Sequence, residues 1–377
     1  MEKKLHIIAF DVPYPPNYGG VIDVFFKIKS LSESGIKITL HCFEYNRSHA
    51  LELEEYCEKV YYYKRQTGLL TNLSLLPYIV ISRKNNALIN NLLDDSSPIL
   101  FEGLHSCYYL NDKRLKSRFK IYRESNIEHV YYFHLFLAQK NPIKSTYFLI
   151  ESIRLYSYQR RLKTANLILA VSKKDANYLQ RSFPLVNVVF LPSFHANTQV
   201  TAQEGSGNYV LYHGNLSVQE NEKAAIFLLK NVFNDLPVRF VIAGLHPSAR
   251  LKTWITKYPY VELFDSPNEQ TMHDLIRNAH IHTIITFQRT GLKLKLINSL
   301  YSGRFCLCNS QMLWGTDLEK LCEVANSAFD MKAAVIRLLN EKFSDSDLQN
   351  RVAVLDKSFG NKINSEKIIH LLFPFNS

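Results

Sequence analysis

The stretch Tyr209-Val210-Leu211-Tyr212-His213-Gly214-Asn215-Leu216 decides the fold of this chain. Strand-forming residues run directly into a glycine, and Asn221 to Phe233 then carries apolar residues at helical spacing. A strand that leads through a glycine loop into a helix is the repeating unit of an open α/β sheet. Its loop lies at the carboxyl end of the strand, where such sheets bind ligands. We therefore predict that a new α/β domain begins at Tyr209.

The residues before this stretch are typical of a linker. Small and polar residues dominate His195 to Asn208, including Gly205-Ser206-Gly207. A chain of 377 residues is also long enough for two domains of ordinary size. We predict an N-terminal domain over residues 1–195, a linker over 196–208 and a C-terminal domain over 209–358. The amphipathic tail from Asn361 to Phe375 is expected to pack on the folded chain.

Both halves of the chain alternate short apolar strands with helical patterns. In the first half, strands are expected at Leu5–Phe10, Lys37–Cys42, Lys59–Tyr63, Ile99–Glu102, Lys120–Arg123, Leu167–Val171 and Val188–Leu191, and helices at Val21–Ser34, Lys84–Leu93 and Thr146–Ala165. In the second half, further strands are expected at Arg239–Ala243, Val261–Phe264, Ile281–Thr286 and Phe305–Cys308, and further helices at Asn268–Asn278 and Leu292–Ser302. This order predicts two doubly wound, Rossmann-like α/β domains, each with a parallel sheet covered by helices.

The charge balance favours anionic partners. The chain has 45 Lys and Arg against 34 Asp and Glu, a net charge of +11, which suits nucleotides, phosphorylated lipids or an anionic membrane surface. The basic residues are spread along the chain without a recognition motif, so no nucleic-acid partner is expected. No apolar run reaches roughly 18 residues, and the N-terminus has no signal-peptide pattern. The six cysteines include no C-x-x-C pair, so we expect a cytoplasmic protein with structural thiols and no metal site.

The stretch Gln288 to Asn298 combines a glycine turn, Thr290-Gly291, with two lysines at an expected helix start. Free amides and the helix dipole attract a phosphate there, although a basic, solvated helix start has the same pattern. Lys293 and Lys295 point to different faces of a regular helix, whereas Lys295 and Asn298 share one. Both lysines can therefore hold one anion only if Lys293 lies in an unwound turn. Asn298 can both donate to and accept from ribose hydroxyls.

Two more glycine loops follow strands in the same half. Gly214 and Gly244 each come directly after an apolar strand, so they are expected to converge with the lysine motif on a nucleotide crevice. In the first half, Gly19 and Gly20 close a proline-rich loop after the strand at Leu5–Phe10. They indicate either a ligand loop or a stiff turn in which glycine allows close packing.

A polar cluster, Glu124-Ser125-Asn126-Ile127-Glu128-His129, follows the strand at Lys120–Arg123. Functional groups collect at such strand ends, so Glu128 or His129 could act as a catalytic base or orient a sugar hydroxyl. The alternative is a helix cap made by Ser125 or Asn126, with Glu128 in the first turn. The two interpretations are compatible.

In their order and spacing, these motifs resemble those of the retaining glycosyltransferases of the GT-B fold, the group 1-like enzymes, especially bacterial members that act on surface glycans. The resemblance covers essentially the whole chain. It rests on Pro15 to Gly20, Arg123 to His129, Ala170 to Asp175, His213-Gly214-Asn215 and Thr290 to Asn298.

The resemblance implies two domains facing across a cleft, with a UDP- or GDP-linked sugar as donor and a glycan or lipid-linked acceptor. The donor diphosphate would be bound by Thr290, Gly291, Lys293 and Lys295. The nucleotide would be bound by Asn298, Gly214, Asn215 and Gly244, and the acceptor or a phosphate by Gly19 and Gly20. Glu128 and His129 would be catalytic. The lysines would neutralise the leaving group without a metal ion or a cofactor. Residues 359–377 would return to the N-terminal domain.

Three positions depart from the family pattern. Asn298 stands where the family carries glutamate, Ser125 where it carries histidine, and Asn215 where it carries arginine. These departures leave two alternatives, namely a catalytically weak or inactive nucleotide-sugar-binding partner protein, or a sugar-nucleotide epimerase. The basic, aromatic segments Tyr61 to Arg65 and Tyr156 to Lys163 are either solvated faces or contacts with an anionic membrane that carries a lipid-linked acceptor.

Overall fold

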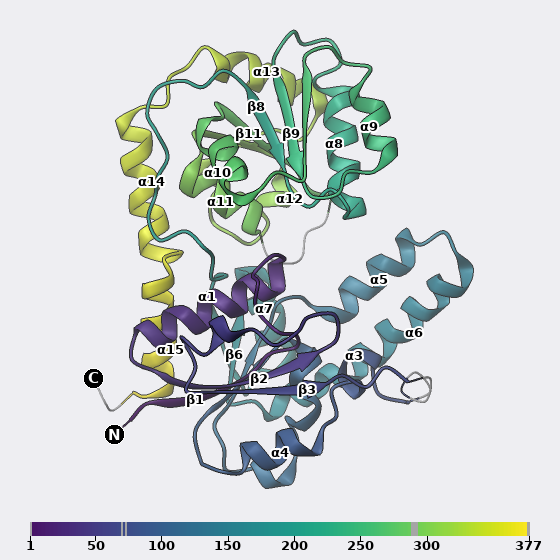
Figure 1. Cartoon of the computed structure of the whole chain (residues 1–377), viewed down its shortest axis with the longest axis vertical. Helices are drawn as coiled ribbons and strands as arrows, with labels where there is room; N and C mark the ends of the chain where they lie inside the picture. The colour runs from purple at the N-terminus through teal and green to yellow at the C-terminus, as the bar shows by residue number, and fades with distance from the viewer. Residues whose placement is uncertain (1, 69–70, 72–73, 288–292, 375–377) are drawn as a thin grey trace. The chain divides into compact units, whose positions relative to one another are not determined.

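The computed structural model of the chain, drawn in Figure 1, describes residues 2–68, 71, 74–287 and 293–374. It divides into two compact units. Unit 1 is drawn from Met1–Ala196 and Asn361–Ser377, and unit 2 from Asn197–Arg289 and Lys293–Gly360. Among the helices that the structure describes, none has the length and hydropathy of a membrane-spanning segment.

Unit 1 contains a seven-stranded parallel sheet in the order β3-β2-β1-β4-β5-β6-β7. The strands are β1 (Lys4–Ile8), β2 (Lys37–Glu44), β3 (Lys59–Lys64), β4 (Ile99–Glu102), β5 (Lys120–Arg123), β6 (Leu167–Ala170) and β7 (Asn187–Phe190). The helices are α1 (Gly19–Glu33), α3 (Tyr78–Ile81), α4 (Asn86–Leu92), α5 (Glu128–Ala138), α6 (Pro142–Gln159), α7 (Lys173–Ser182) and α15 (Asn361–Leu372). The strand order reverses between β1 and β4, which creates a switch point where α/β proteins bind ligands.

Unit 2 contains a six-stranded parallel sheet in the order β10-β9-β8-β11-β12-β13. The strands are β8 (Val210–His213), β9 (Phe240–Gly244), β10 (Val261–Asp265), β11 (Ile281–Ile284), β12 (Phe305–Cys308) and β13 (Glu323–Val324). The helices are α8 (Gln219–Asn231), α9 (Ala249–Ile255), α10 (Glu269–Asn278), α11 (Leu294–Ser302), α12 (Ser310–Leu313), α13 (Ala328–Leu339) and α14 (Asp345–Ser358). Here the order reverses between β8 and β11. The two sheets confirm the predicted fold class of two doubly wound α/β domains.

One helix boundary differs clearly from the prediction. The helix expected over Thr146–Ala165 begins four residues earlier, at Pro142, because the Asn141 side chain accepts a hydrogen bond from Lys144 N at 3.1 Å and proline suits the first helical position. Its predicted end is a separate 3₁₀-helix, Arg160–Thr164. Apolar spacing alone does not reveal such a cap.

The last helix, α15, packs on α1 within unit 1. The Ser365 hydroxyl donates a hydrogen bond to Ser30 Oγ at 2.8 Å, and Ile368 is buried in the core below α1. The Asn361 side chain accepts from His195 N at 3.2 Å and donates to His195 O at 2.7 Å. Helix α15 is therefore fixed to the residues at which unit 1 passes into the linker.

Candidate functional site

In unit 2, two glycines let the ends of β8 and β9 approach each other closely. A Cβ atom on Gly244 would lie 1.7 Å from Gly214 O, a distance that no side chain tolerates. Gly214 itself has a φ of +152°, and a Cβ there would lie 3.0 Å from Lys295 Cδ. The structure thus brings three of the predicted donor-site residues, Gly214, Gly244 and Lys295, together at the carboxyl edge of the sheet.

Lys295 is a largely buried cation at this edge. Its Nζ donates a hydrogen bond to Asn221 Oδ1 at 2.7 Å and lies 5.4 Å from the centre of the Tyr212 ring. Burial lowers the pKa of Lys295 to about 8; nearby Glu220 opposes this shift and Lys293 adds to it. Within the described residues, no carboxylate forms an ion pair with Lys295. A bound anion would therefore stabilise its charged form.

Helix α11 begins at Leu294, and Lys293 occupies the position before it with non-helical angles, φ −97° and ψ 40°. Lys293 therefore lies outside the regular helix, as it must if it and Lys295 are to meet one anion. The Lys293 side chain does not cap the helix, so it leaves the amides of the first turn to other partners. Thr290 and Gly291, also predicted for the diphosphate, lie outside the described residues.

The two predicted asparagines already have partners inside unit 2. Asn298 Oδ1 accepts a hydrogen bond from Asn197 Nδ2 in the linker at 2.9 Å. Asn215 Oδ1 accepts from the backbone N and the hydroxyl of Ser217 at 3.0 and 2.7 Å, which shapes the loop after β8. Their contacts with a nucleotide stay predictions.

The first turn of α8 also contributes to this site, through Glu220 and Asn221, which were not predicted from the sequence. Glu220 Oε1 accepts hydrogen bonds from the Thr286 hydroxyl and, at 3.2 Å, from Phe287 N, so it fixes the residues that follow β11. Asn221 holds Lys295 and also donates to Asn215 O at 2.8 Å. Polar residues in the first turn after a glycine loop are the signal that could have identified both.

His213, the last residue of β8, is buried beneath this site. Its Nε2 lies 3.0 Å from Ser299 Oγ, a residue of α11. Burial and the charge of Lys295 lower the pKa of His213 to about 3. The imidazole is therefore neutral at physiological pH, and it connects β8 to α11 rather than facing a ligand.

In unit 1, Glu128 and His105 form a second polar site near the switch point. Glu128 is the first residue of α5 and is buried, and burial raises its pKa to about 8 against the opposing charge of Arg83. His105 Nδ1 lies 3.9 Å from Glu128 Oε1. Gly103, with φ +66°, leaves room for His105, since a Cβ there would lie 3.2 Å from the ring. His105 was not predicted, because a single histidine after a strand gives no distinctive pattern.

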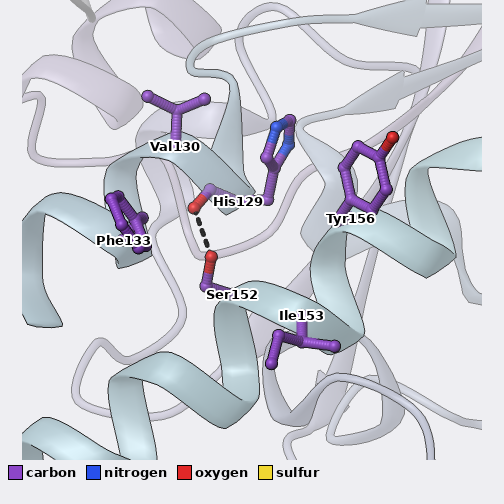
Figure 2. Close-up of a pocket in the computed structure, with 6 residues that line it drawn as sticks. All are labelled: His129, Val130, Phe133, Ser152, Ile153 and Tyr156. Carbon is purple, nitrogen blue, oxygen red and sulfur yellow. Dashed lines mark hydrogen bonds between the residues drawn. The ribbon is translucent and has the colours of Figure 1, made fainter.

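His129, the neighbour of Glu128, points elsewhere. Figure 2 shows its carbonyl accepting a hydrogen bond from the Ser152 hydroxyl, at 2.7 Å, and its ring beside Tyr156. The ring lines an apolar cavity of about 290 Å³ between α5 and α6. The structure therefore does not bring the two predicted catalytic side chains together, because successive helical residues diverge by about 100°. The catalytic role of each stays a prediction.

The glycine loop after β1 packs tightly. Gly19 is the first residue of α1, and a Cβ on Gly20 would lie 2.6 Å from Phe10 Cζ. The Tyr18 hydroxyl donates to Asp11 Oδ2 at 2.8 Å. These contacts favour the stiff-turn interpretation of the loop, which remains compatible with ligand binding.

Arg123, one anchor of the resemblance, belongs to a buried network of charges. It contacts Asp23 with two hydrogen bonds of 3.1 Å, and Lys27 Nζ lies 3.0 Å from Asp23 Oδ2 and 2.7 Å from Glu102 Oε1. Although burial opposes it, Arg123 and Lys27 hold the pKa of Asp23 well below its usual range. Arg123 also donates to Leu191 O at 2.6 Å, so this residue stabilises the residues before the linker.

The two sheets have the GT-B fold, which confirms the predicted resemblance at the level of fold. A mutant of S. aureus TarM, in complex with fondaparinux, α-GlcNAc-glycerol and UDP, is similar at a TM-score of 0.68 and 13% identity, with 100% of both chains covered. Anabaena HepE with UDP and glucose has a TM-score of 0.66 and 11% identity, with 99% of both chains covered. WaaG, described as a glycosyltransferase of lipopolysaccharide biosynthesis, has a TM-score of 0.64 and 10% identity, with 98% of this chain and 99% of WaaG covered.

The chain is also similar in sequence to a Klebsiella protein. This relative is an uncharacterised 44.6 kDa protein of the cps region of Klebsiella pneumoniae, 24% identical over 326 residues, which cover 81% of this chain and 83% of the relative. No protein-family model matches the chain.

Proposed function

We propose that this chain is a glycosyltransferase that moves a sugar from a nucleotide-sugar donor to a glycan or lipid-linked acceptor. The observation that carries the proposal is the convergence of Gly214, Gly244 and Lys295 at the carboxyl edge of the unit 2 sheet. Two neighbours in fold, TarM and HepE, were solved with UDP, which supports a nucleotide-sugar ligand for this fold.

Unit 2 is the proposed donor unit. The glycines allow the backbone to approach the nucleotide, and Lys295, with Lys293 from the turn before α11, stabilises the negative charge that develops on the leaving diphosphate. Two cations at this place can supply the charge stabilisation that a divalent metal supplies elsewhere. We therefore propose transfer without a metal ion or a cofactor, from a UDP- or GDP-linked donor.

Unit 1 is the proposed acceptor unit. With a pKa raised to about 8, Glu128 is mostly protonated at neutral pH, and burial and the charge of Arg83 hold the pKa of His105 well below its usual range. A protonated carboxyl and a neutral imidazole can hydrogen-bond sugar hydroxyls without adding charge. Retention of the anomeric configuration is proposed from the resemblance.

We further propose a bacterial surface polysaccharide as the product and the inner face of the membrane as the place of transfer. The relative from a cps region and the lipopolysaccharide enzyme WaaG among the neighbours in fold support this setting. The net charge of +11 suits an anionic lipid surface.

The first experiment measures thermal stabilisation by UDP, GDP and their common sugar conjugates. A ligand at a hundred times its Kd stabilises the folded state by about 2.7 kcal/mol, so one nucleotide should raise the Tm clearly. The stabilising donor is then incubated with membrane extract, with and without EDTA, and the product's anomeric configuration is read by NMR. If no nucleotide shifts the Tm, the donor site is assigned wrongly.

The second candidate is a GT-B protein that binds a nucleotide sugar without turning it over. The observation in its favour is that Asn298 and Asn215, which depart from the family pattern, are already engaged within unit 2. Nucleotide binding without donor hydrolysis or transfer would select this candidate. Conversion of the free donor without any acceptor would instead indicate an epimerase.

A further inference from the structure

The segment 128–164, which we call the α5–α6 hairpin, has an unusual surface charge. It contains six basic residues, Lys140, Lys144, Arg154, Arg160, Arg161 and Lys163, and only two acidic ones, Glu128 and Glu151. Both carboxylates are buried: Glu128 faces His105, while Glu151 accepts from Arg154 and from Tyr78 N, both at 2.8 Å. The surface of the hairpin therefore presents positive charge and no carboxylate.

The same hairpin carries a concentration of exposed apolar side chains. Of the 23 large hydrophobic residues exposed in the described chain, seven lie here: Phe133, Leu137, Ile143, Tyr147, Ile150, Ile153 and Tyr156. The fractions exposed are 81% for Ile143, 63% for Leu137 and 62% for Ile153. A tenth of the chain thus carries almost a third of its exposed large apolar residues, which is typical of an interaction surface.

These side chains are arranged along both helices and toward the tip. Phe133 and Leu137 are four apart on α5, and Ile143, Tyr147 and Ile150 follow a spacing of four and three on α6. Figure 1 shows α5 and α6 side by side, with their connection pointing away from the sheet of unit 1. Three of these side chains, Phe133, Ile153 and Tyr156, also line the apolar cavity between the helices that Figure 2 draws.

We propose that the α5–α6 hairpin docks on an anionic lipid bilayer, with the apolar side chains of its tip in the interface and its lysines and arginines on the lipid phosphates. Apolar and cationic groups without exposed carboxylates fit such a surface. Docking of the hairpin on a second copy of itself would instead bring positive charges close together. The inference rests on the proposed membrane setting but not on sugar transfer.

Of the two segments that the sequence leaves open as either solvated faces or membrane contacts, the hairpin contains Tyr156 to Lys163. The other, Tyr61 to Arg65, largely coincides with strand β3, where Tyr63 OH lies 2.8 Å from His41 Nδ1 and from Asn91 Nδ2. Those tyrosines belong to the sheet, so the hairpin is the surface we select.

The test sediments the full chain with vesicles of phosphatidylcholine alone and of phosphatidylcholine and phosphatidylglycerol in a two-to-one mixture. We expect binding to the anionic vesicles that weakens at high salt. The variant L137S/I143S should bind at least tenfold more weakly. Its control, L75S/L185S, removes two still more exposed leucines elsewhere in unit 1, 92% and 99% exposed, and should bind as the parent does.

The charge is tested with K140Q/K144Q, for which we expect roughly a fivefold loss per cation, against the control K113Q/K116Q. The proposal is overturned if the hairpin variants bind anionic vesicles as well as their controls do. It is also overturned if the parent chain does not bind anionic vesicles. A change in self-association instead of vesicle binding would assign the surface to a second copy. Thermal stabilisation by UDP, measured on every variant, reports the donor site separately.

Discussion

Replacing Lys295 by methionine should strengthen the fold and weaken nucleotide binding at once. Burial lowers the pKa of this lysine from its ordinary 10.5 to about 8, so the folded state binds fewer protons than the unfolded state between those values. Stability therefore rises with pH through that window, and below pH 8 the charged lysine carries a penalty. The full shift corresponds to about 3 kcal/mol.

Methionine removes this penalty but also removes the hydrogen bond from Lys295 Nζ to Asn221 Oδ1, so the net gain is smaller. We expect about 1 kcal/mol, or roughly 2–4 °C in Tm for a domain of this size. A hydrogen bond to a charged group contributes about 1.5–3 kcal/mol, so the affinity for UDP at pH 7 should fall roughly 10- to 150-fold.

The pH dependence provides the sharper measurement. Because the free protein's Lys295 has a pKa of about 8, UDP affinity should be flat near pH 7 and weaken by roughly tenfold at pH 9. In K295M this dependence should disappear, apart from the titration of UDP itself. Calorimetry at pH 7, 8 and 9 measures the UDP affinity of the parent and of K295M. The substitution Lys342→Met, at an exposed position, is the control for the loss of one charge. UDP affinity unchanged in K295M, or flat with pH in the parent, would refute the reasoning.

Three further predictions concern single residues. Gly244→Ala puts a Cβ 1.7 Å from Gly214 O and should cost about 3 kcal/mol of unfolding free energy in urea titrations; a neutral effect would mean that the two strand ends are further apart. The raised pKa of Glu128 makes the parent lose stability as pH rises from 4.5 to about 8, by about 1.4 kcal/mol per pH unit at most, and thermal melts of Glu128→Gln should lack this fall. Asn298→Glu keeps an acceptor for Asn197 and supplies the family's carboxylate, so donor hydrolysis should increase; no change would place the cause of any low activity elsewhere.

The strands were predictable because parallel strands buried on both faces are continuous apolar runs, as at Ile99–Glu102 and Phe305–Cys308. Strand β13 was not, because its two residues include Glu323 and carry no such run. The glycines at strand ends, such as Gly214, were predictable for a similar reason. A glycine directly after an apolar run indicates a strand end where the backbone is approached closely.

The polar partners of the site could not be predicted in the same way. Asn221 meets Lys295 across 74 residues of sequence, and His105 meets Glu128 because β4 and β5 are neighbours in the sheet. Such contacts depend on strand order, which apolar patterns do not specify. Conversely, residues that are adjacent in sequence can belong to different sites. Glu128 and His129 suggested one site, but on the helix their side chains point to two different places.

The two candidate sites share one electrostatic property, a titratable group whose pKa lies near 8. Burial is the main cause of both shifts, and it brings the pKa of Lys295 in unit 2 and of Glu128 in unit 1 to about 8. Below pH 8 the lysine is positive and the carboxyl is neutral; above it, the lysine is neutral and the carboxylate is negative. The first change weakens the proposed binding of an anionic donor in unit 2, and the second places a negative charge in the proposed acceptor site of unit 1. Nucleotide affinity should therefore decline above pH 8 in the parent and in E128Q alike, but not in K295M.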